Sequence, residues 1–373
     1  MTPRHRSSAA PLAWTMVALV LYASLYPFTG WRWPVGNTAL GLMQLPWPPW
    51  LTPLDEALNF VGYLPLGLLA AVAALRTGRS ALTALAGTVV LASLLSYGCE
   101  LLQHLLPGRH PSLKDWLMNT LGAMAGALLG LLLSSTGALE RWHRMRQRWF
   151  ARQAAGALAL LALWPLGLLF PTPVPWGLGA VGEPLRETLL EWLTGVDWAG
   201  GLSDLLQPSP APPRLGPLAE RLAAATGLLS PVLVAYGVTR PGLPRAVLGA
   251  GALLLGYLTM AVSALLNYGP AHVLSWLTPA AAVGSVAAAV AGLLLLPVSP
   301  RVAQGLALLV LGVGLSLVAQ APSDPYFAQN VQAWEQGRFV RFHGLAQWVG
   351  WGWPFLAIAW LVARLARREG ASG

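Results

Sequence analysis

Polar and ionisable side chains are concentrated between residues 55 and 119 of a chain that is otherwise strongly apolar. Charged residues make up only 10% of its 373 residues. Because an ionisable group inside or beside a lipid bilayer is costly, such a concentration indicates a functional site. The nine candidate binding residues are Asp55, Asn59, Tyr63, Glu100, Gln103, Arg109, Ser112, Asp115 and Asn119.

The spacing of these residues predicts three groups, each on one face of a helix. Side chains three or four residues apart are neighbours on a helix surface. We expect the three helix ends to converge at one membrane face and to form one site there. The groups are Asp55 with Asn59 and Tyr63, Glu100 with Gln103 and His104, and Ser112 with Asp115 and Asn119.

The residue types suit the binding of an anion or acid–base chemistry. Arg109 follows a Pro-Gly pair in a loop, where its planar guanidinium could hold a phosphate or carboxylate through two hydrogen bonds. Two carboxylates at a membrane face could also acquire different pKa values and act as acid and base. A hydrolase or transferase would use Asp55, Glu100 or Asp115, and the catalytic residues stay unknown.

Structural roles are the alternative for several of these residues. Arg109 could form a salt bridge to one of the carboxylates and hold three helix ends together, since charges near a bilayer are usually paired. Ser112, three residues before Asp115, fits the N-cap of a helix whose dipole the Asp115 carboxylate complements. Asn119 lies one turn deeper, where an amide could join two helices or contact a ligand.

The sequence has none of the common metal or cofactor motifs. Oxygen and nitrogen ligands could come from Asp55, Glu100, His104 and Asp115, but there is no His-x-x-x-His pair, cysteine pair or EF-hand spacing. There is also no P-loop, dinucleotide fingerprint or nucleophile elbow. We therefore expect neither a metal nor a cofactor, and the sequence leaves open whether the protein is an enzyme.

Composition and segment length predict an all-α membrane protein. Apolar residues make up 55% of the chain, and the mean hydropathy is +0.58. Apolar runs recur at roughly 20 residues, the length that a helix needs to cross a hydrocarbon core of about 30 Å. Runs of this length favour a polytopic helical bundle over a barrel. The ten predicted spans are roughly 12–28, 57–75, 81–101, 116–133, 154–170, 222–238, 246–266, 273–296, 302–318 and 345–362.

The charge distribution predicts that both termini lie in the cytoplasm. With this orientation the cytoplasmic loops hold 15 Arg and two Glu, and the other side holds 8 basic and 12 acidic residues. Positive charge is enriched in the cytoplasmic loops of membrane proteins. The net charge of +9 is thereby explained without nucleic acid, and membrane lipids are the expected contacts of the arginines.

The chain divides into two membrane blocks joined by a basic segment. The first block holds four spans and the candidate site, and the second holds six spans and two extracytoplasmic loops. The expected boundaries are 1–139 for the four-span domain, 140–153 for a cytoplasmic linker, 154–373 for the six-span domain, and 171–221 and 320–342 for its loops.

The first of these loops contains an apolar stripe at helical spacing, made of Leu185, Leu189, Trp192 and Val196. The stripe predicts a surface helix over 183–198. Such a helix lies on the outer leaflet or packs on the helix bundle.

Four short motifs follow one another in the first block. In order, they are Asp55 ahead of Tyr63 and Gly67; Glu100 with Gln103; Pro107, Gly108 and Arg109; and Asp115 with Asn119 and Gly122. Over roughly residues 12–135 this arrangement resembles the VanZ-like family. Many members have a His where this chain has Asn59, so a histidine-dependent metal or proton role is not expected at that position.

The resemblance implies a bacterial cytoplasmic (inner) membrane protein, and the family takes its name from a member associated with low-level teicoplanin resistance. We expect an integral protein of the cell envelope whose outward-facing polar pocket binds or modifies an anionic envelope lipid or lipid-linked glycan. Glycopeptide susceptibility could change as a result. A transporter or flippase for an envelope precursor is the alternative, although transport sites usually lie near the bilayer midplane. The sequence does not indicate protein partners.

Overall fold

Helices form almost all of the regular structure in the part of the chain that the computed structural model describes. Within these residues the only other regular element is one isolated bridge between Phe150 and Thr239. The expectation of an all-α fold is therefore confirmed. The described residues are 9–26, 28–34, 36, 38–47, 53–107, 109–151, 154–194, 198, 200–206, 215–321 and 340–369.

Apolar helices occupy all ten of the segments that the sequence predicts to span the membrane. Among the described residues, seven of these helices are long and apolar enough to cross a membrane. The other three are shorter, namely Ala9–Leu25, Ala155–Leu168 and Pro279–Leu294. The chain is thus a polytopic helical membrane protein, and the side on which its termini lie stays a prediction.

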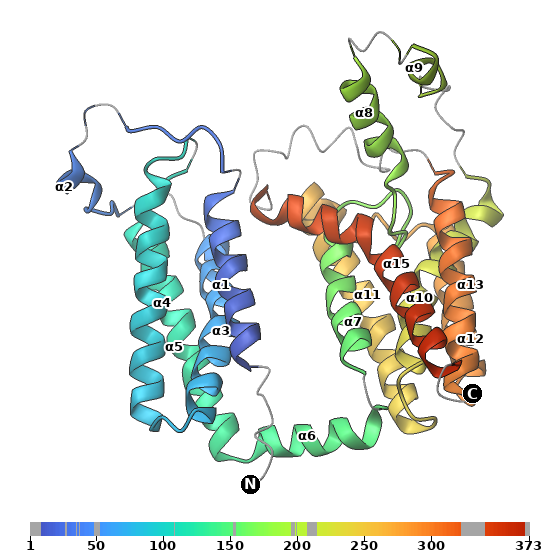
Figure 1. The fold of residues 1–373 in the computed structure, drawn as a ribbon, viewed down its shortest axis with the longest axis horizontal. Helices are drawn as coiled ribbons and strands as arrows, with labels where there is room; N and C mark the ends of the chain where they lie inside the picture. The colour runs from blue at the N-terminus through green and yellow to red at the C-terminus, as the bar shows by residue number, and fades with distance from the viewer. Residues whose placement is uncertain are drawn as a thin grey trace. The chain divides into compact units, whose positions relative to one another are not determined.

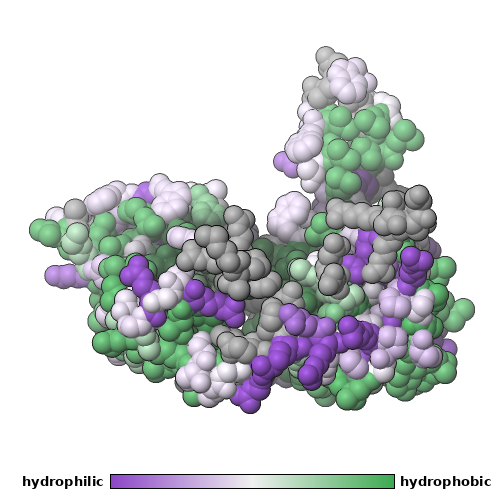
Figure 2. All heavy atoms as spheres, turned by 60° about the horizontal axis from the view of Figure 1, so that its bottom comes forward, coloured by the Kyte–Doolittle hydropathy of each residue, from purple (hydrophilic) through white to green (hydrophobic). Residues whose placement is uncertain are grey.

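The chain forms two compact units, residues 1–145 and 146–373. The boundary falls inside an amphipathic helix, α6 (Ala138–Trp149), within the segment that the sequence marks as a basic linker. Figure 1 shows both units, and Figure 2 shows hydrophobic side chains over much of the visible surface of the apolar helices. Such surfaces suit contact with lipid tails.

Unit 1 contains the candidate site. Its α1, α3, α4 and α5 are the apolar helices, and the short α2 lies in the connection between α1 and α3 (Figure 1). The bounds are α1 Ala9–Leu25, α2 Ala39–Leu42, α3 Pro53–Arg76, α4 Ala81–Gln103 and α5 Leu113–Ser135.

Helices α3 and α5 are in backbone contact along a row of glycines. A methyl group at Gly122 of α5 would lie 2.1 Å from the carbonyl oxygen of Phe60, and one at Gly126 would lie 2.0 Å from that of Leu64. Small residues at four-residue spacing allow membrane helices to approach this closely. The glycines are therefore required by the packing of α3 against α5.

The same contact fixes the position of the polar residues at the start of α5. On α3, a methyl group at Gly67 would lie 2.0 Å from the carbonyl oxygen of Ala123. Asp115 and Asn119 precede the glycine row and belong to the same buried face of α5. Their side chains are consequently directed toward α3 and α4 rather than toward lipid.

Unit 2 is built around α10, the most buried of the membrane-length helices, which packs against α12, α13, α11 and α7. Its core includes the fully buried Trp164, Trp176 and Trp353. The bounds are α7 Ala155–Leu168, α8 Gly182–Leu193, α9 Gly200–Leu206, α10 Pro217–Tyr236, α11 Leu243–Tyr268, the 3-10 turn η2 Pro270–His272, α12 Pro279–Leu294, α13 Pro300–Val318 and α15 Val340–Glu369.

Arg245, at the start of α11, is completely buried and binds backbone carbonyl oxygens. Its Nη2 donates to Tyr236 at 3.0 Å, and its Nε donates to Thr239 at 3.2 Å. Its Nη1 donates to Leu296 at 2.9 Å and also to Val298. The side chain thus joins the end of α10 to the end of α12. From the sequence we counted Arg245 only as a positive charge in a loop, whereas the structure shows its side chain buried inside unit 2.

Two of the loop predictions fall partly outside the described residues. Most of the loop predicted at 320–342 lies there, as do residues 195–197, 199 and 207–214 of the loop predicted at 171–221. The surface helix expected over 183–198 is α8, and it ends at Leu193 because Thr194 is already extended (φ −63°, ψ 122°). Packing of α8 is mainly with α9, and its Leu185 and Trp192 side chains are exposed.

Candidate functional site

The candidate site lies where α1 and α4 end and α3 and α5 begin. Asp55 is in the first turn of α3, and its side chain is outside the described part of the structure. Asn59, one turn further, is half-buried, and Tyr63 is buried. The four-residue spacing of Asn59 and Tyr63 on one continuous helix places these two on one face of α3.

A buried hydrogen bond joins the end of α4 to the start of α5. Glu100 is only 3% exposed, and its Oε2 accepts a hydrogen bond from the backbone amide of Ser112 at 2.9 Å. The Ser112 hydroxyl oxygen in turn accepts from the amides of Lys114 at 3.2 Å and Asp115 at 3.1 Å. Ser112 is therefore the N-cap of α5, as its spacing predicts.

Asn119 connects α5 to α4 through a residue that the sequence does not single out. Its Nδ2 donates to the hydroxyl oxygen of Ser96 at 3.0 Å, and Ser96 is completely buried. Asn119 is 7% exposed, and no hydrogen-bond partner reaches its Oδ1 among the described residues. Ser96 lies four residues before Glu100 on α4. This helical spacing puts the two residues on one face and could have identified Ser96 as part of the site.

Tyr63 supplies a second unsatisfied polar atom in the same region. The side chain is 5% exposed and packs with Ala92 and Cys99 of α4 and Ala123 of α5. The Ser96 side chain approaches the Tyr63 hydroxyl, but no hydrogen bond of normal geometry forms to it within the described structure. Since buried polar groups are nearly always hydrogen-bonded, this hydroxyl and the amide oxygen of Asn119 both need an explanation.

Gln103 and Arg109 contact the last turn of α1. Gln103 Nε2 donates to the carbonyl oxygen of Ser24 at 3.2 Å, and Arg109 Nη2 donates to those of Tyr26 and, at 3.5 Å, Ala23. The last carbonyls of a helix lack partners within the helix and carry partial negative charge. Arg109 therefore caps α1, a contact that neither the anion-binding hypothesis nor the salt-bridge hypothesis anticipates.

An ion pair joins the first turns of α3 and α5 beside the cluster. Lys114 Nζ contacts Glu56 Oε1, and both side chains are partly exposed. The sequence prediction missed both residues because each stands next to a more conspicuous acid, Asp55 or Asp115. Their pairing adds a second link between the helices that carry the site.

The site combines two buried carboxylates with amide and hydroxyl groups. Glu100 is tied to the loop before α5, and Asp115, 6% exposed, lies in the first turn of α5, where the helix dipole favours a negative charge. In the part of the chain that the structure describes, no three His, Cys, Asp or Glu side chains are placed to hold a metal ion. The arrangement is suited to hydrogen bonding with a polar group.

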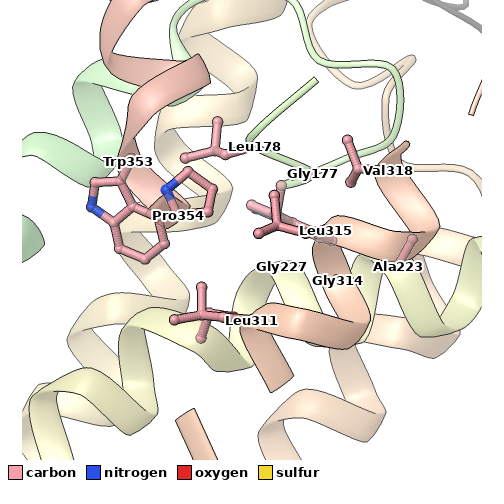
Figure 3. A pocket seen from close by; sticks show the side chains of 12 residues that line it. Gly177, Leu178, Ala223, Gly227, Leu311, Gly314, Leu315, Val318, Trp353 and Pro354 are labelled. Atoms are coloured by element: carbon pink, nitrogen blue, oxygen red, sulfur yellow. The ribbon is translucent and has the colours of Figure 1, made fainter. Parts of the chain in front are cut away.

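A small pocket in unit 2 has a different character. It lies between the loop after α7 and helices α10, α13 and α15, and its lining has no ionisable residue (Figure 3). It has room for roughly one water molecule. Gly177, Gly227 and Gly314 contribute to its walls. This pocket offers no chemistry comparable with that of unit 1.

Comparison with known families agrees with the motifs of unit 1. Residues 5–134, about one third of the chain, match the family model described as VanZ/LLP1. No curated protein and no solved structure matches the chain. The matched range includes α1 to α4, all but the last residue of α5, and every candidate site residue. Residues 5–134 are thus a VanZ-like domain, which is followed by further apolar helices that the family model does not cover.

Proposed function

We propose that the VanZ-like domain binds the head group of an envelope lipid or lipid-linked glycan at the polar cluster of unit 1. One observation carries this proposal: buried carboxylates and amides gather at one end of an otherwise apolar unit. Four of these side chains are at most 7% exposed, namely Glu100, Gln103, Asp115 and Asn119. Polar groups in membrane helices are costly and usually serve a function.

The position of the cluster suits a lipid head group. It lies at the ends of α3, α4 and α5, where a membrane-embedded ligand would place its polar part near the bilayer surface. With the termini in the cytoplasm, this end faces outward, in the bacterial cytoplasmic membrane. Arg109 adds positive charge there, which favours a ligand that also carries a phosphate.

A role in glycopeptide susceptibility follows from the same proposal. A protein that binds an envelope precursor would change how much of that precursor is accessible to other molecules, glycopeptides included. The resemblance to the VanZ-like family motivates this step. The polar cluster provides the residues on which it can be tested.

Native mass spectrometry of the protein in mild detergent tests the proposal. We compare the wild type with Asp115→Asn, which keeps the shape of the side chain and removes its charge. Because hydrogen bonds to charged groups contribute about 1.5–3 kcal/mol, the co-purified lipid should fall about tenfold or more. Glu56→Gln, which removes a carboxylate from the Lys114 ion pair outside the buried cluster, is the control and should retain the lipid. Equal lipid occupancy in wild type and Asp115→Asn would refute the proposal.

A further inference from the structure

The unsatisfied atoms of Tyr63 and Asn119 define what kind of chemical group the site accepts. Both side chains are more than nine-tenths buried, and both lie among α3, α4 and α5. A buried polar atom without a partner costs roughly 1–3 kcal/mol. Both side chains lie beside the Ser96 hydroxyl, and a ligand group placed there would recover that cost.

The hydrogen-bonding capacity of the two atoms is complementary. The amide oxygen of Asn119 can only accept, because its nitrogen already donates to Ser96 and fixes the orientation of the amide. The Tyr63 hydroxyl can donate as well as accept. The group that satisfies both must therefore donate one hydrogen bond and be able to accept another.

The surrounding charges exclude an anionic group at this position. Glu100 lies one helical turn from Ser96 and interacts with Tyr63, and Asp115 lies one turn from Asn119 on α5, so both buried carboxylates are carried by the helix turns that hold the Tyr63–Asn119 pair. Like charges in a buried site repel each other strongly. A phosphate would also offer only acceptors to the oxygen of Asn119, whereas an alcohol offers a donor and an acceptor.

We infer that Tyr63 and Asn119 bind a neutral hydroxyl group of the ligand, which is a sugar or glycerol hydroxyl of an envelope lipid. This inference rests on the proposed binding function and names the chemistry of its ligand. The phosphate of such a lipid would lie away from the two carboxylates. Sugar and glycerol head groups share the recognised group, and the test below distinguishes them.

The test measures affinities of the full-length protein for three lipids that have the same acyl chains. Phosphatidylglycerol and phosphatidylmethanol carry the same phosphodiester charge, but only the former has head-group hydroxyls. Monoglucosyl diacylglycerol has sugar hydroxyls and no charge. We expect wild-type protein to bind at least one hydroxyl-bearing lipid about three- to tenfold more tightly than phosphatidylmethanol, the effect of one or two neutral hydrogen bonds.

Tyr63→Phe removes the hydroxyl and nothing else. Because this hydroxyl has no partner in the structure, the variant should melt at or above the wild-type temperature. It should bind phosphatidylmethanol as the wild type does and lose the preference for the hydroxyl-bearing lipid. Tyr97→Phe is the matched control, since its hydroxyl donates to the carbonyl oxygen of Met43. This control should keep the preference.

The outcomes separate this inference from the proposed function. If Asp115→Asn weakens lipid binding but wild type shows no preference for hydroxyl-bearing lipids, the cluster binds lipid and the hydroxyl inference is wrong. The hydroxyl inference is also wrong if Tyr63→Phe keeps the preference for hydroxyl-bearing lipids. In that case water alone would occupy the site beside Tyr63 and Asn119. If none of the three lipids binds, both the inference and the proposed function are overturned.

Discussion

The carboxylate of Glu100 accepts a hydrogen bond from the backbone amide of Ser112 across 2.9 Å. This bond fixes the loop between α4 and α5 at the point where α5 begins, and Ser112 then caps α5 with its own side chain. The Glu100 carboxylate, which could take part in ligand binding or catalysis, therefore also stabilises the connection between α4 and α5. The two roles can be separated by substitution.

Glu100→Ala should destabilise the domain, because the buried amide of Ser112 would lose its acceptor. The expected cost is about 1–3 kcal/mol, visible as a lower melting temperature in detergent. Glu100→Gln retains an oxygen that can accept the same bond and should lose much less stability. If Glu100→Ala melts like the wild type, the Glu100–Ser112 bond contributes nothing to the fold.

Gly67→Ala should strongly destabilise the packing of α3 against α5. Its methyl group would lie 2.0 Å from the carbonyl oxygen of Ala123, so the two backbones would have to separate. We expect a loss of about 1–3 kcal/mol from overpacking. Gly62→Ala in the same helix meets nothing within 4 Å and should be neutral or more stable by up to about 1 kcal/mol. Melting temperatures of the two variants compare these effects directly, and equal values would contradict the close contact.

Much of the fold was predictable from the sequence because each membrane helix is marked by a long run of apolar residues. A membrane helix needs roughly 20 consecutive apolar residues, and such runs identify all ten apolar helices. The N-cap at Ser112 was also predictable, since it depends only on local spacing. The early end of α8 was missed, because the apolar stripe of Leu185, Leu189 and Trp192 says nothing about where the backbone becomes extended.

The partners of Arg109 and Arg245 were not predictable, for a common physical reason. Both guanidinium groups donate to backbone carbonyl oxygens at helix ends, and every residue carries a carbonyl. No side-chain pattern marks which carbonyls converge. The sequence could therefore not indicate which carbonyl oxygens these two side chains reach, because tertiary packing decides which of these acceptors converge.

Arg245→Lys should destabilise unit 2, because an ammonium on a flexible stem cannot reach four carbonyl oxygens as the planar guanidinium does. A lost hydrogen bond to a charged group lowers the free energy of unfolding by about 1.5–3 kcal/mol. Arg240→Lys, at an exposed side chain nearby, is the control and should change stability little. The measurement is thermal unfolding of both variants in detergent. Similar melting temperatures would show that the carbonyl contacts of Arg245 are not needed.

The contacts of Arg186 lead us to expect that the packing of α8 against α9 depends on pH. Its Nη1 donates to the carbonyl oxygen of Leu206 at 3.0 Å, and its Nε donates to Glu183 Oε2 at 3.1 Å. The hydrogen bond from Arg186, with its positive charge, lowers the pKa of Glu183 from the usual 4.5. A lowered carboxyl pKa stabilises the folded form fully above 4.5 and loses that effect as the pH falls through the lowered value.

The expected consequence is that the α8–α9 pair loosens in acid. A spin label at Leu205→Cys, an exposed position in α9, reports the mobility of the pair, and the buried Cys99 should not compete for the label. Label mobility should stay constant from neutral pH down to 4.5 and then increase. Glu183→Gln removes the titrating group, so the label should be mobile at every pH and its dependence below 4.5 should disappear. An acid transition that persists unchanged in Glu183→Gln would assign the loosening to another carboxylate.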